Sequence, residues 1–287
     1  MFLASTARYR EWRAAKLDSY PECVDELVTG IGGLTDLSKS AKAIILESLK
    51  RANMAIYTCR DVLVDRAAIC TFAADFGLLR LDHHLCANDD GVAELTVASG
   101  GRRSDYVPYS DHSLSWHTDG YYNEESSRVR AVVLHCAQDA AAGGETAVLD
   151  PEIAYIRLRD ANPAFIDAFE HPECMTIPAN VEDGDEIRPA VGGPVFSFDG
   201  PGGALHMRYS ERRKNIRWRD DPTTTAARQF LSDLFADDYG PVLRYRLRPG
   251  QGLISNNVLH NRTAFKDGPA QKRLLYRARF FDRIDSK

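Results

Sequence analysis

Several features that define common classes of protein are missing from this sequence of 287 residues. No run approaches the roughly 20 apolar residues that a membrane-spanning helix requires. The N-terminal stretch becomes charged at Arg8 and does not resemble a signal peptide. The formal net charge of −5 argues against a nucleic-acid-binding face. We therefore expect a cytoplasmic protein without a membrane or nucleic-acid partner.

Cysteines are few, and none forms a Cys-x-x-Cys pair. They lie in apolar or mixed runs, which favours free thiols in a reducing compartment over a disulfide framework. A hydrophobic fraction of 44% provides a core without disulfides. The six positions are Cys23, Cys59, Cys70, Cys86, Cys136 and Cys174.

Helical patterns occupy the start of the chain and two later stretches. Residues 1–52 are expected to be mainly helical, because residues 38–53 carry apolar side chains at helical spacing behind a serine-rich start. Asp65 is a candidate N-cap for a helix that ends at Gly77. Residues 151–169 and 223–238 predict two further helices.

From about residue 92 the pattern changes to short β-type runs separated by Gly, Pro or Asp turns. We predict a single domain over residues 1–287, with a helical N-terminal extension (1–52) and a mainly β-type core (53–287). Many short strands with inserted helices favour a β-barrel or jelly roll. Residues 179–193 are the most loop-like stretch and are either a mobile lid or a plain loop.

A histidine and a carboxylate stand two residues apart in the sequence WHTD. On a strand, His117 and Asp119 would point to the same face. One further neutral ligand would complete a two-histidine, one-carboxylate triad, which is typical of non-haem Fe(II) oxygenases. His260, at the end of a short apolar strand, is the candidate. A zinc hydrolase could use the same ligand types, although the chain has no His-Glu-x-x-His helix.

The sequence RLLYRARFF (273–281) alternates between two kinds of side chain. One face carries Arg273, Arg277 and Arg279, and the other is apolar or aromatic. The arginines would face solvent if the strand lay in an ordinary sheet. If the strand lines a cavity, they require anionic partners, and a dicarboxylate bound to the metal would provide one.

These motifs together resemble the clavaminate-synthase-like (TauD/TfdA-type) branch of Fe(II)/2-oxoglutarate-dependent dioxygenases, which includes taurine dioxygenase and γ-butyrobetaine hydroxylase. The resemblance covers roughly residues 50–283 and implies a double-stranded β-helix (jelly-roll) core. His171 and Glu173 share the His-x-acid pattern but lie outside these motifs, so we interpret that pair as chance. The matching segments are LSWHTDGYYN, RVRAVVLHCAQDAAAGGETAVLDPEIAYIRLRDANP, RPGQGLISNNVLHNRTAF and RLLYRARFFD.

The resemblance implies roles for individual residues. His117, Asp119 and His260 match the iron ligands, while Arg273 and Thr146 match residues that bind 2-oxoglutarate. Arg277 matches the position that holds an anionic group of the substrate. The oxidant forms on the metal with O₂, so no separate protein acid or base is expected. The retained Asp119 implies hydroxylation or a related oxidation and not halogenation.

Substrate contacts are less well specified by the sequence. Tyr121 and Tyr122 could form an aromatic wall or be ordinary loop residues. The basic run 207–221 is expected to be mostly a solvated surface, but its Arg208 and Tyr209 are candidates to hold a carboxylate or sulfonate. The run's basic residues are Arg208, Arg212, Arg213, Lys214, Arg217 and Arg219.

The implied function is Fe(II)/2-oxoglutarate-dependent hydroxylation or oxidative cleavage of a small charged metabolite, such as an amino acid, betaine or sulfonate, with release of succinate and CO₂. Two departures from the family limit the inference. Residues 1–52 contain only Cys23 and not the clustered cysteines of an N-terminal zinc module, and the GYYN that follows Asp119 is not shared with the best-known members. The alternatives are a non-catalytic sensor of 2-oxoglutarate or O₂ and a zinc-dependent hydrolase. A homo-oligomer is compatible with the sequence.

Overall fold

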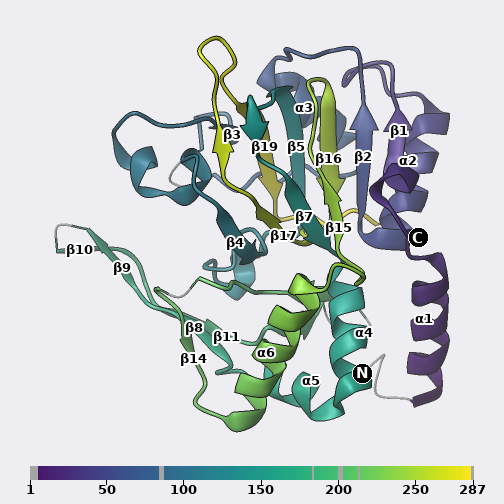
Figure 1. Ribbon diagram of the computed structural model, residues 1–287, viewed down its shortest axis with the longest axis vertical. Helices are drawn as coiled ribbons and strands as arrows, with labels where there is room; N and C mark the ends of the chain where they lie inside the picture. The colour runs from purple at the N-terminus through teal and green to yellow at the C-terminus, as the bar shows by residue number, and fades with distance from the viewer. Residues whose placement is uncertain (1–5, 84–86, 183, 200–202, 213, 286–287) are drawn as a thin grey trace.

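The computed structural model describes residues 6–83, 87–182, 184–199, 203–212 and 214–285 (Figure 1). Cys86 and Arg213, both considered above, lie outside these ranges, and the other five cysteines are free thiols. Among the described helices none is both long enough and apolar enough to span a bilayer. The α-helices are α1 (Thr6–Ser19), α2 (Lys39–Ala52), α3 (Arg66–Ala74), α4 (Pro151–Ala161), α5 (Pro163–Phe169) and α6 (Pro222–Ala236). Short 3₁₀ helices are η1 (Val24–Leu27), η2 (Arg102–Asp105), η3 (Val107–Tyr109) and η4 (Glu125–Ser127).

The largest sheet has six strands in the order β1-β2-β16-β5-β19-β3. Apart from the parallel pair β1–β2, its neighbouring strands are antiparallel. The strands are β1 (Val28–Gly30), β2 (Met54–Thr58), β16 (Gln251–Ser255), β5 (Ala131–Gln138), β19 (Leu274–Phe280) and β3 (Val92–Leu95).

A four-stranded sheet in the order β15-β7-β17-β4 forms the second main layer. A cavity between the two sheets is lined by Leu134 of β5 and Arg277 of β19 from one sheet, and by Thr146 of β7 and His260 of β17 from the other. This two-sheet arrangement is consistent with the expected jelly-roll core. The strands are β15 (Leu243–Tyr245), β7 (Thr146–Leu149), β17 (Leu259–Arg262) and β4 (Leu114–His117).

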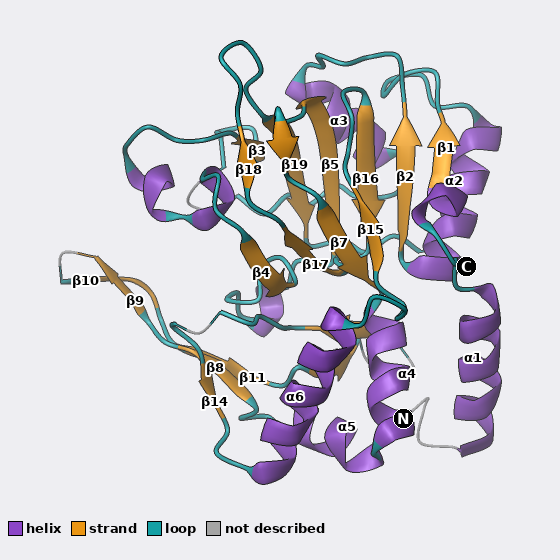
Figure 2. Ribbon diagram, viewed as in Figure 1, coloured by secondary structure: helices purple, strands orange, loops and turns teal. Residues whose placement is uncertain are grey.

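The remaining strands form small sheets at the periphery (Figure 2). β9 and β10 make a hairpin that projects from the body (Figure 1). The strands are β6 (Ala142–Gly143) with β18 (Phe265–Lys266), β9 (Asn180–Glu182) with β10 (Asp185–Arg188), β12 (Phe196–Phe198) with β13 (Leu205–Met207), and β8 (Met175–Ile177) between β11 (Val191–Gly193) and β14 (Arg217–Trp218).

Apolar helix faces pack against the two sheets in different ways. Ile45 of α2 and Phe72 of α3 are fully buried in one cluster with Val133 and Ile254 of the six-stranded sheet. Helices α4, α5 and α6 belong to another cluster, which includes Trp116 of β4, and they lie beyond the end of the four-stranded sheet (Figure 1). The six-stranded sheet therefore has α2 and α3 packed against it.

The expectation for residues 1–52 is only partly correct. Helix α2 forms as predicted, and the Ser38 hydroxyl caps it by accepting from the Ala41 amide at 3.1 Å. However, β1 extends the six-stranded sheet by pairing in parallel with β2. This segment is therefore part of the core sheet and not a separate helical extension, because strand pairing between distant segments is not encoded in local periodicity.

Two other local predictions also need correction. The helix predicted at 151–169 is two helices, because Asn162 is extended and caps α5, with Pro163 in the first turn. The stretch 179–193, predicted as a loop, contains β9, β10 and β11. The helix that Asp65 caps ends at Ala74, before Gly77.

Candidate metal centre

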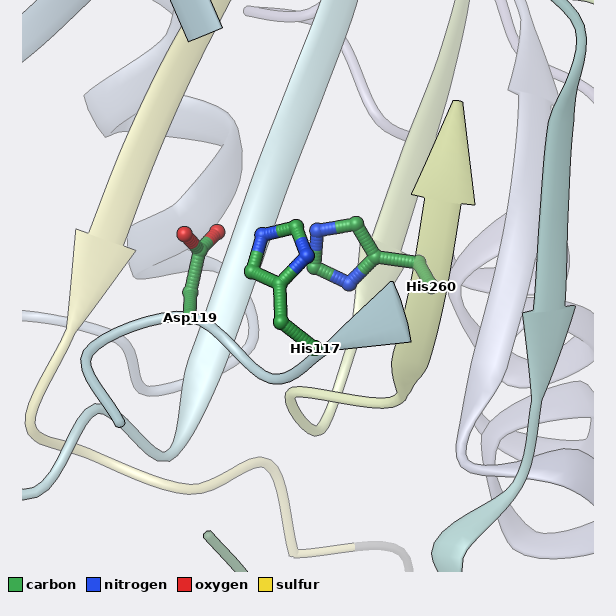
Figure 3. A group of neighbouring side chains, drawn as sticks. All are labelled: His117, Asp119 and His260. Atoms are coloured by element: carbon green, nitrogen blue, oxygen red, sulfur yellow. The ribbon is translucent and has the colours of Figure 1, made fainter. Parts of the chain in front are cut away.

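Three side chains from two distant segments of the sequence come together (Figure 3), and two of them, Asp119 and His260, line the cavity between the sheets. β17 pairs antiparallel with β4, and this register sets His260 directly opposite His117. Asp119 follows two residues later and points to the same space (Figure 3). One potential ligand atom from each of His117, Asp119 and His260 lies within 4.8 Å of the others, which is close enough to share one metal ion.

Backbone carbonyls determine which histidine nitrogen faces the site. His117 Nδ1 lies 2.8 Å from the Ser115 carbonyl oxygen, and His260 Nδ1 lies 3.0 Å from that of Val258. A carbonyl oxygen only accepts, so each Nδ1 must carry the proton and donate. Each Nε2 then has a free lone pair, which is the tautomer that a metal ligand requires.

Only one of the two carboxylate oxygens of Asp119 has a hydrogen-bond partner among the described residues. Its Oδ1 accepts from Arg277 Nη1 at 3.1 Å and lies 3.7 Å from Arg279 Nη1. Its Oδ2 is buried and has no hydrogen-bond partner among the described residues. A buried carboxylate oxygen without a partner is costly, and a cation bound between Oδ2 and the two Nε2 atoms would satisfy it. The residues present therefore fit a metal ion.

The surroundings keep His117 and Asp119 in the form that binds metal. Burial, together with the nearby His260, lowers the pKa of His117 to about 3, so this imidazole is neutral at physiological pH. Burial opposes ionisation of Asp119, but the positive charges of Arg277 and Arg279 outweigh it and hold the pKa of that carboxyl below its usual range. Asp119 is therefore already ionised and His117 already neutral, so neither has to lose a proton before it binds a metal ion.

Asn257 connects the two halves of the site. Its Oδ1 accepts from the Asp119 amide at 2.8 Å, and its Nδ2 donates to the carbonyls of Asp119 at 2.9 Å and Val129 at 2.6 Å. The residue adopts a left-handed conformation with φ of 51°, which Asn tolerates better than most residues. The sequence analysis did not single out Asn257, because its importance depends on a contact across 138 positions.

We expect Asn257→Gly to weaken both the fold and the metal site. Glycine accepts the positive φ, so the variant removes only the side-chain hydrogen bonds. Leaving buried backbone groups unpaired should lower the free energy of unfolding by about 2–3 kcal/mol. Releasing Asp119 should weaken Fe(II) binding about 10–100-fold, as for other partners that orient metal ligands. Urea unfolding and anaerobic Fe(II) titration measure the two effects.

Asn162→Ala is the matched control for this variant. Asn162 caps α5 through the Ala164 amide at 3.1 Å. Its loss should cost about 1 kcal/mol of stability and leave Fe(II) affinity unchanged. A similar loss of Fe(II) affinity in both variants would show that metal binding follows general stability, and the specific role of Asn257 would be rejected.

Arg273 and Thr146 line the same cavity as Asp119 and His260. The Arg273 guanidinium is stacked 5.0 Å from the Phe265 ring centre and is only 6% exposed. Its Nη1 has no hydrogen-bond partner among the described residues, and burial lowers the pKa of Arg273. A buried, unpaired guanidinium beside a metal site is suited to bind the carboxylate of a ligand that reaches the metal.

The arginine-bearing face of β19 points into the protein. Arg277 and Arg279 are 6% and 2% exposed, which excludes the alternative of a solvated outer face. Arg277 lies on the Asp119 carboxylate. Arg279 pairs with Asp82 and donates to the Tyr122 hydroxyl at 2.9 Å.

The two tyrosines after Asp119 lie beside the metal ligands. The Tyr121 ring stands edge-on to His117, with centroids 6.3 Å apart, and Tyr122 stands edge-on to Tyr121 at 5.3 Å. Tyr121 therefore contacts a metal-ligand candidate, and Tyr122 contacts Tyr121.

Arg208 and Tyr209 have structural surroundings that the sequence did not reveal. The buried Arg208 guanidinium donates to four backbone carbonyls, those of Tyr121, Met175, Val191 and Gly193. Tyr209 is buried in the apolar cluster against Trp218 and Phe235, with ring centroids at 5.8 and 6.0 Å. The carboxylate- or sulfonate-binding role expected for this pair is therefore not supported by their contacts. Both connect peripheral segments to the core.

The fold and the site define a protein with a candidate metal centre of the two-histidine, one-carboxylate class between two β-sheets. Residues 34–279 match the family described as taurine catabolism dioxygenase TauD, TfdA family. The chain belongs to this family and is a 2-oxoglutarate-dependent dioxygenase that uses Fe(II).

Two curated relatives and two solved structures illustrate this similarity. A uridine-5′-phosphate dioxygenase of a Streptomyces species is 29% identical over 264 residues, covering 88% of this chain and 93% of that protein. One of an Amycolatopsis species is 27% identical over 168 residues, covering 57% and 59%. An asparagine oxygenase in complex with Fe(II), 3-hydroxyasparagine and succinate superimposes with a TM-score of 0.60 at 16% identity, covering 84% and 79%. A taurine dioxygenase from Burkholderia xenovorans superimposes with a TM-score of 0.58 at 18% identity, covering 91% and 89%.

Proposed function

We propose that this dioxygenase oxidises a C–H bond of a small metabolite with an anionic end, in a single jelly-roll domain where His117, Asp119 and His260 hold Fe(II). One observation carries the residue assignment. Asp119 and Arg273 line the same cavity, and among the described residues neither Oδ2 of Asp119 nor Nη1 of Arg273, both buried, has a hydrogen-bond partner. A metal ion satisfies the first, and the distal carboxylate of 2-oxoglutarate satisfies the second.

Each residue has a defined task in this proposal. The metal supplies the activation of O₂ that is coupled to conversion of 2-oxoglutarate into succinate and CO₂. Arg273 fixes the far end of the co-substrate, and the Thr146 hydroxyl, on the same cavity wall, is placed to donate to it. Arg277 keeps Oδ1 of Asp119 occupied, so Oδ2 is the oxygen left for the metal. Because the Asp119 ligand is present, we expect hydroxylation or a related oxidation.

The names of the relatives supply a set of candidate substrates for this protein. The curated relatives are named for uridine 5′-phosphate, and the similar solved structures are named for asparagine and taurine. A phosphate, a carboxylate and a sulfonate are all anionic at neutral pH. We therefore propose an anionic substrate and begin the screen with uridine 5′-monophosphate, followed by asparagine, taurine and betaines.

Anaerobic reconstitution with Fe(II) and 2-oxoglutarate tests the proposed site. Chelation of Fe(II) by the keto acid gives a weak visible charge-transfer band, which Zn²⁺ cannot give. We expect this band in the wild-type protein and succinate release when O₂ and a substrate are added. A folded protein without the band would refute the iron-site assignment. A band without succinate release for any substrate would favour the sensor alternative.

A further inference from the structure

The segment after β13 carries arginines on the same face as a metal-ligand candidate. Residues 208–212 run antiparallel beside β4, with Ser210 opposite His117 and the Thr118 amide donating to the Tyr209 carbonyl at 3.0 Å. The Glu211 amide continues this pairing by donating to the Trp116 carbonyl at 2.8 Å. Side chains alternate along an extended segment. Arg208 and Arg212, which lie two residues before and two residues after Ser210, therefore share the face of His117.

Arg212 differs from Arg208 in what its guanidinium does. The Arg208 guanidinium is buried and committed to backbone carbonyls. Arg212 is exposed, and its Nη1 donates to the Tyr121 hydroxyl at 3.3 Å. Tyr121 in turn stands against the His117 ring at 6.3 Å. The exposed Arg212 guanidinium is therefore connected to the ligand candidate His117 through the Tyr121 side chain.

Arg188, at the end of β10, adds a second positive charge near Tyr121. It is half-buried and donates to the carbonyls of Pro178 and Pro189, both at 2.6 Å. Burial lowers the pKa of Arg188, and the phenols of Tyr121 and Tyr122 are close enough to oppose this shift. Burial and the positive charges of Arg128 and Arg188 lower the pKa of Arg208 to about 10. These arginines are thus neighbours that repel one another.

Among the described residues, three of these arginines lack an acidic partner. Across the part of the chain that the structure describes, Arg188, Arg208 and Arg212 have no Asp or Glu oxygen within the 4.0 Å of an ion pair, and Arg128 is paired only with the exposed Glu125. By contrast, the buried Arg279 pairs with Asp82, and the half-buried Arg130 pairs with Asp199. Uncompensated like charges beside an active site are the arrangement expected where an anionic ligand completes the charge balance.

We propose that Arg212, together with the Tyr121 hydroxyl, binds the anionic end of the organic substrate and that this end is a phosphate monoester. The proposal rests on the proposed function and specifies its substrate class. A guanidinium beside a phenol hydroxyl offers several donors to a dianion with three terminal oxygens. The Tyr121 hydroxyl, which accepts from Arg212, can donate its own proton to a phosphate oxygen.

This placement separates two anion-binding functions. Arg273 and Thr146 lie on the wall of the cavity between the sheets, and that wall includes neither Tyr121, Arg188 nor Arg212. The co-substrate and the substrate would therefore reach the metal from different sides and would not compete for one arginine.

Binding of uridine 5′-monophosphate and of uridine to the anaerobic Fe(II)–2-oxoglutarate protein tests the proposal. Calorimetry gives the affinities for wild type, Arg212→Gln and Arg217→Gln. Arg217 is the matched control, because it belongs to the same basic run but is exposed on β14. We expect Arg212→Gln to weaken binding of the phosphate ester about tenfold or more and to leave the weaker binding of uridine unchanged. Arg217→Gln should bind both like wild type.

Each outcome separates this inference from the proposed function. The charge-transfer band of Fe(II) and 2-oxoglutarate reports on the metal site alone and should be the same in all three proteins. If the band is present but the monophosphate does not bind, or binds Arg212→Gln as tightly as wild type, the phosphate subsite is refuted and the dioxygenase assignment stands. If the band is absent, the proposed iron site fails.

Discussion

Replacing Asp119 by alanine should abolish Fe(II) binding and substrate-dependent succinate release. Among the described residues Asp119 is the one anionic member of the ligand set, so its removal should lower the metal affinity by more than the roughly 10–100-fold seen when a partner outside the ligand set is removed. Equilibrium dialysis with Fe(II) under anaerobic conditions measures the affinity, and the charge-transfer band should disappear in parallel.

The same substitution also disturbs the surrounding charges. Arg277 and Arg279 are buried and both face the Asp119 carboxylate. Removing one partner of a buried ion pair costs about 3–5 kcal/mol, so a thermal melt must establish that Asp119→Ala is folded. His260→Gln provides a second variant. The His260 ring is held by the Val258 carbonyl, and Arg277 and Arg279 face Asp119, so this substitution removes a ligand candidate without leaving those charges unpaired.

Glu173→Ala is the control for the sequence motif itself. His171 and Glu173 have the same spacing as His117 and Asp119, but Glu173 is exposed. This variant should bind Fe(II) and release succinate like wild type. Retention of full activity in Asp119→Ala, or loss of metal in Glu173→Ala, would contradict the assignment of the ligands.

Replacing Arg273 by methionine should have opposite effects on co-substrate binding and on stability. In the ligand-free protein this guanidinium is buried with an unpartnered Nη1. An apolar side chain of similar length removes a desolvated charge, so the free energy of unfolding should be unchanged or higher by about 1–2 kcal/mol. Affinity for 2-oxoglutarate should fall about 100-fold, the equivalent of about 2.8 kcal/mol for a charge-assisted contact with a carboxylate.

Arg248→Met is the comparison for this prediction. Arg248 is 65% exposed on its side chain and pairs with Asp139 at 3.3 Å, so it is not available to the cavity in the same way. Titration of 2-oxoglutarate, monitored by the charge-transfer band, should give wild-type affinity for Arg248→Met. If Arg273→Met also binds 2-oxoglutarate normally, another group holds the distal carboxylate, and Arg246 on the same cavity wall becomes the next residue to test.

The sequence was informative where a local pattern and a long-range motif agree. Alternation on a strand predicted that Arg273, Arg277 and Arg279 share a face, and the structure buries all three. The His-x-Asp spacing predicted a shared direction for His117 and Asp119, and the structure brings His260 to them. The roles of these residues remain predictions that the experiments above address.

The features that the sequence did not reveal depend on contacts between distant segments. β1 joins the six-stranded sheet through a parallel pairing that no local periodicity encodes. Arg208 was a plausible anion binder until its four carbonyl partners, which come from separate segments, were known. The same applies to Asn257, whose side chain is unremarkable in sequence but joins Asp119 to the strand region that carries His260.

The position of β19 has a consequence for the order in which the protein folds. This strand, Leu274–Phe280, lies inside the six-stranded sheet between β5 and β3, although both of its neighbours precede it by well over a hundred residues. Pairings of such high sequence separation form slowly, because the intervening chain must be ordered first. We therefore expect β5 and β3 to keep unpaired edges until β19 pairs with them. That pairing also brings Arg273, Arg277 and Arg279 to the proposed site. The three ligand candidates, His117, Asp119 and His260, all precede β19 in the chain, so these arginines are the last part of that site to be put in place.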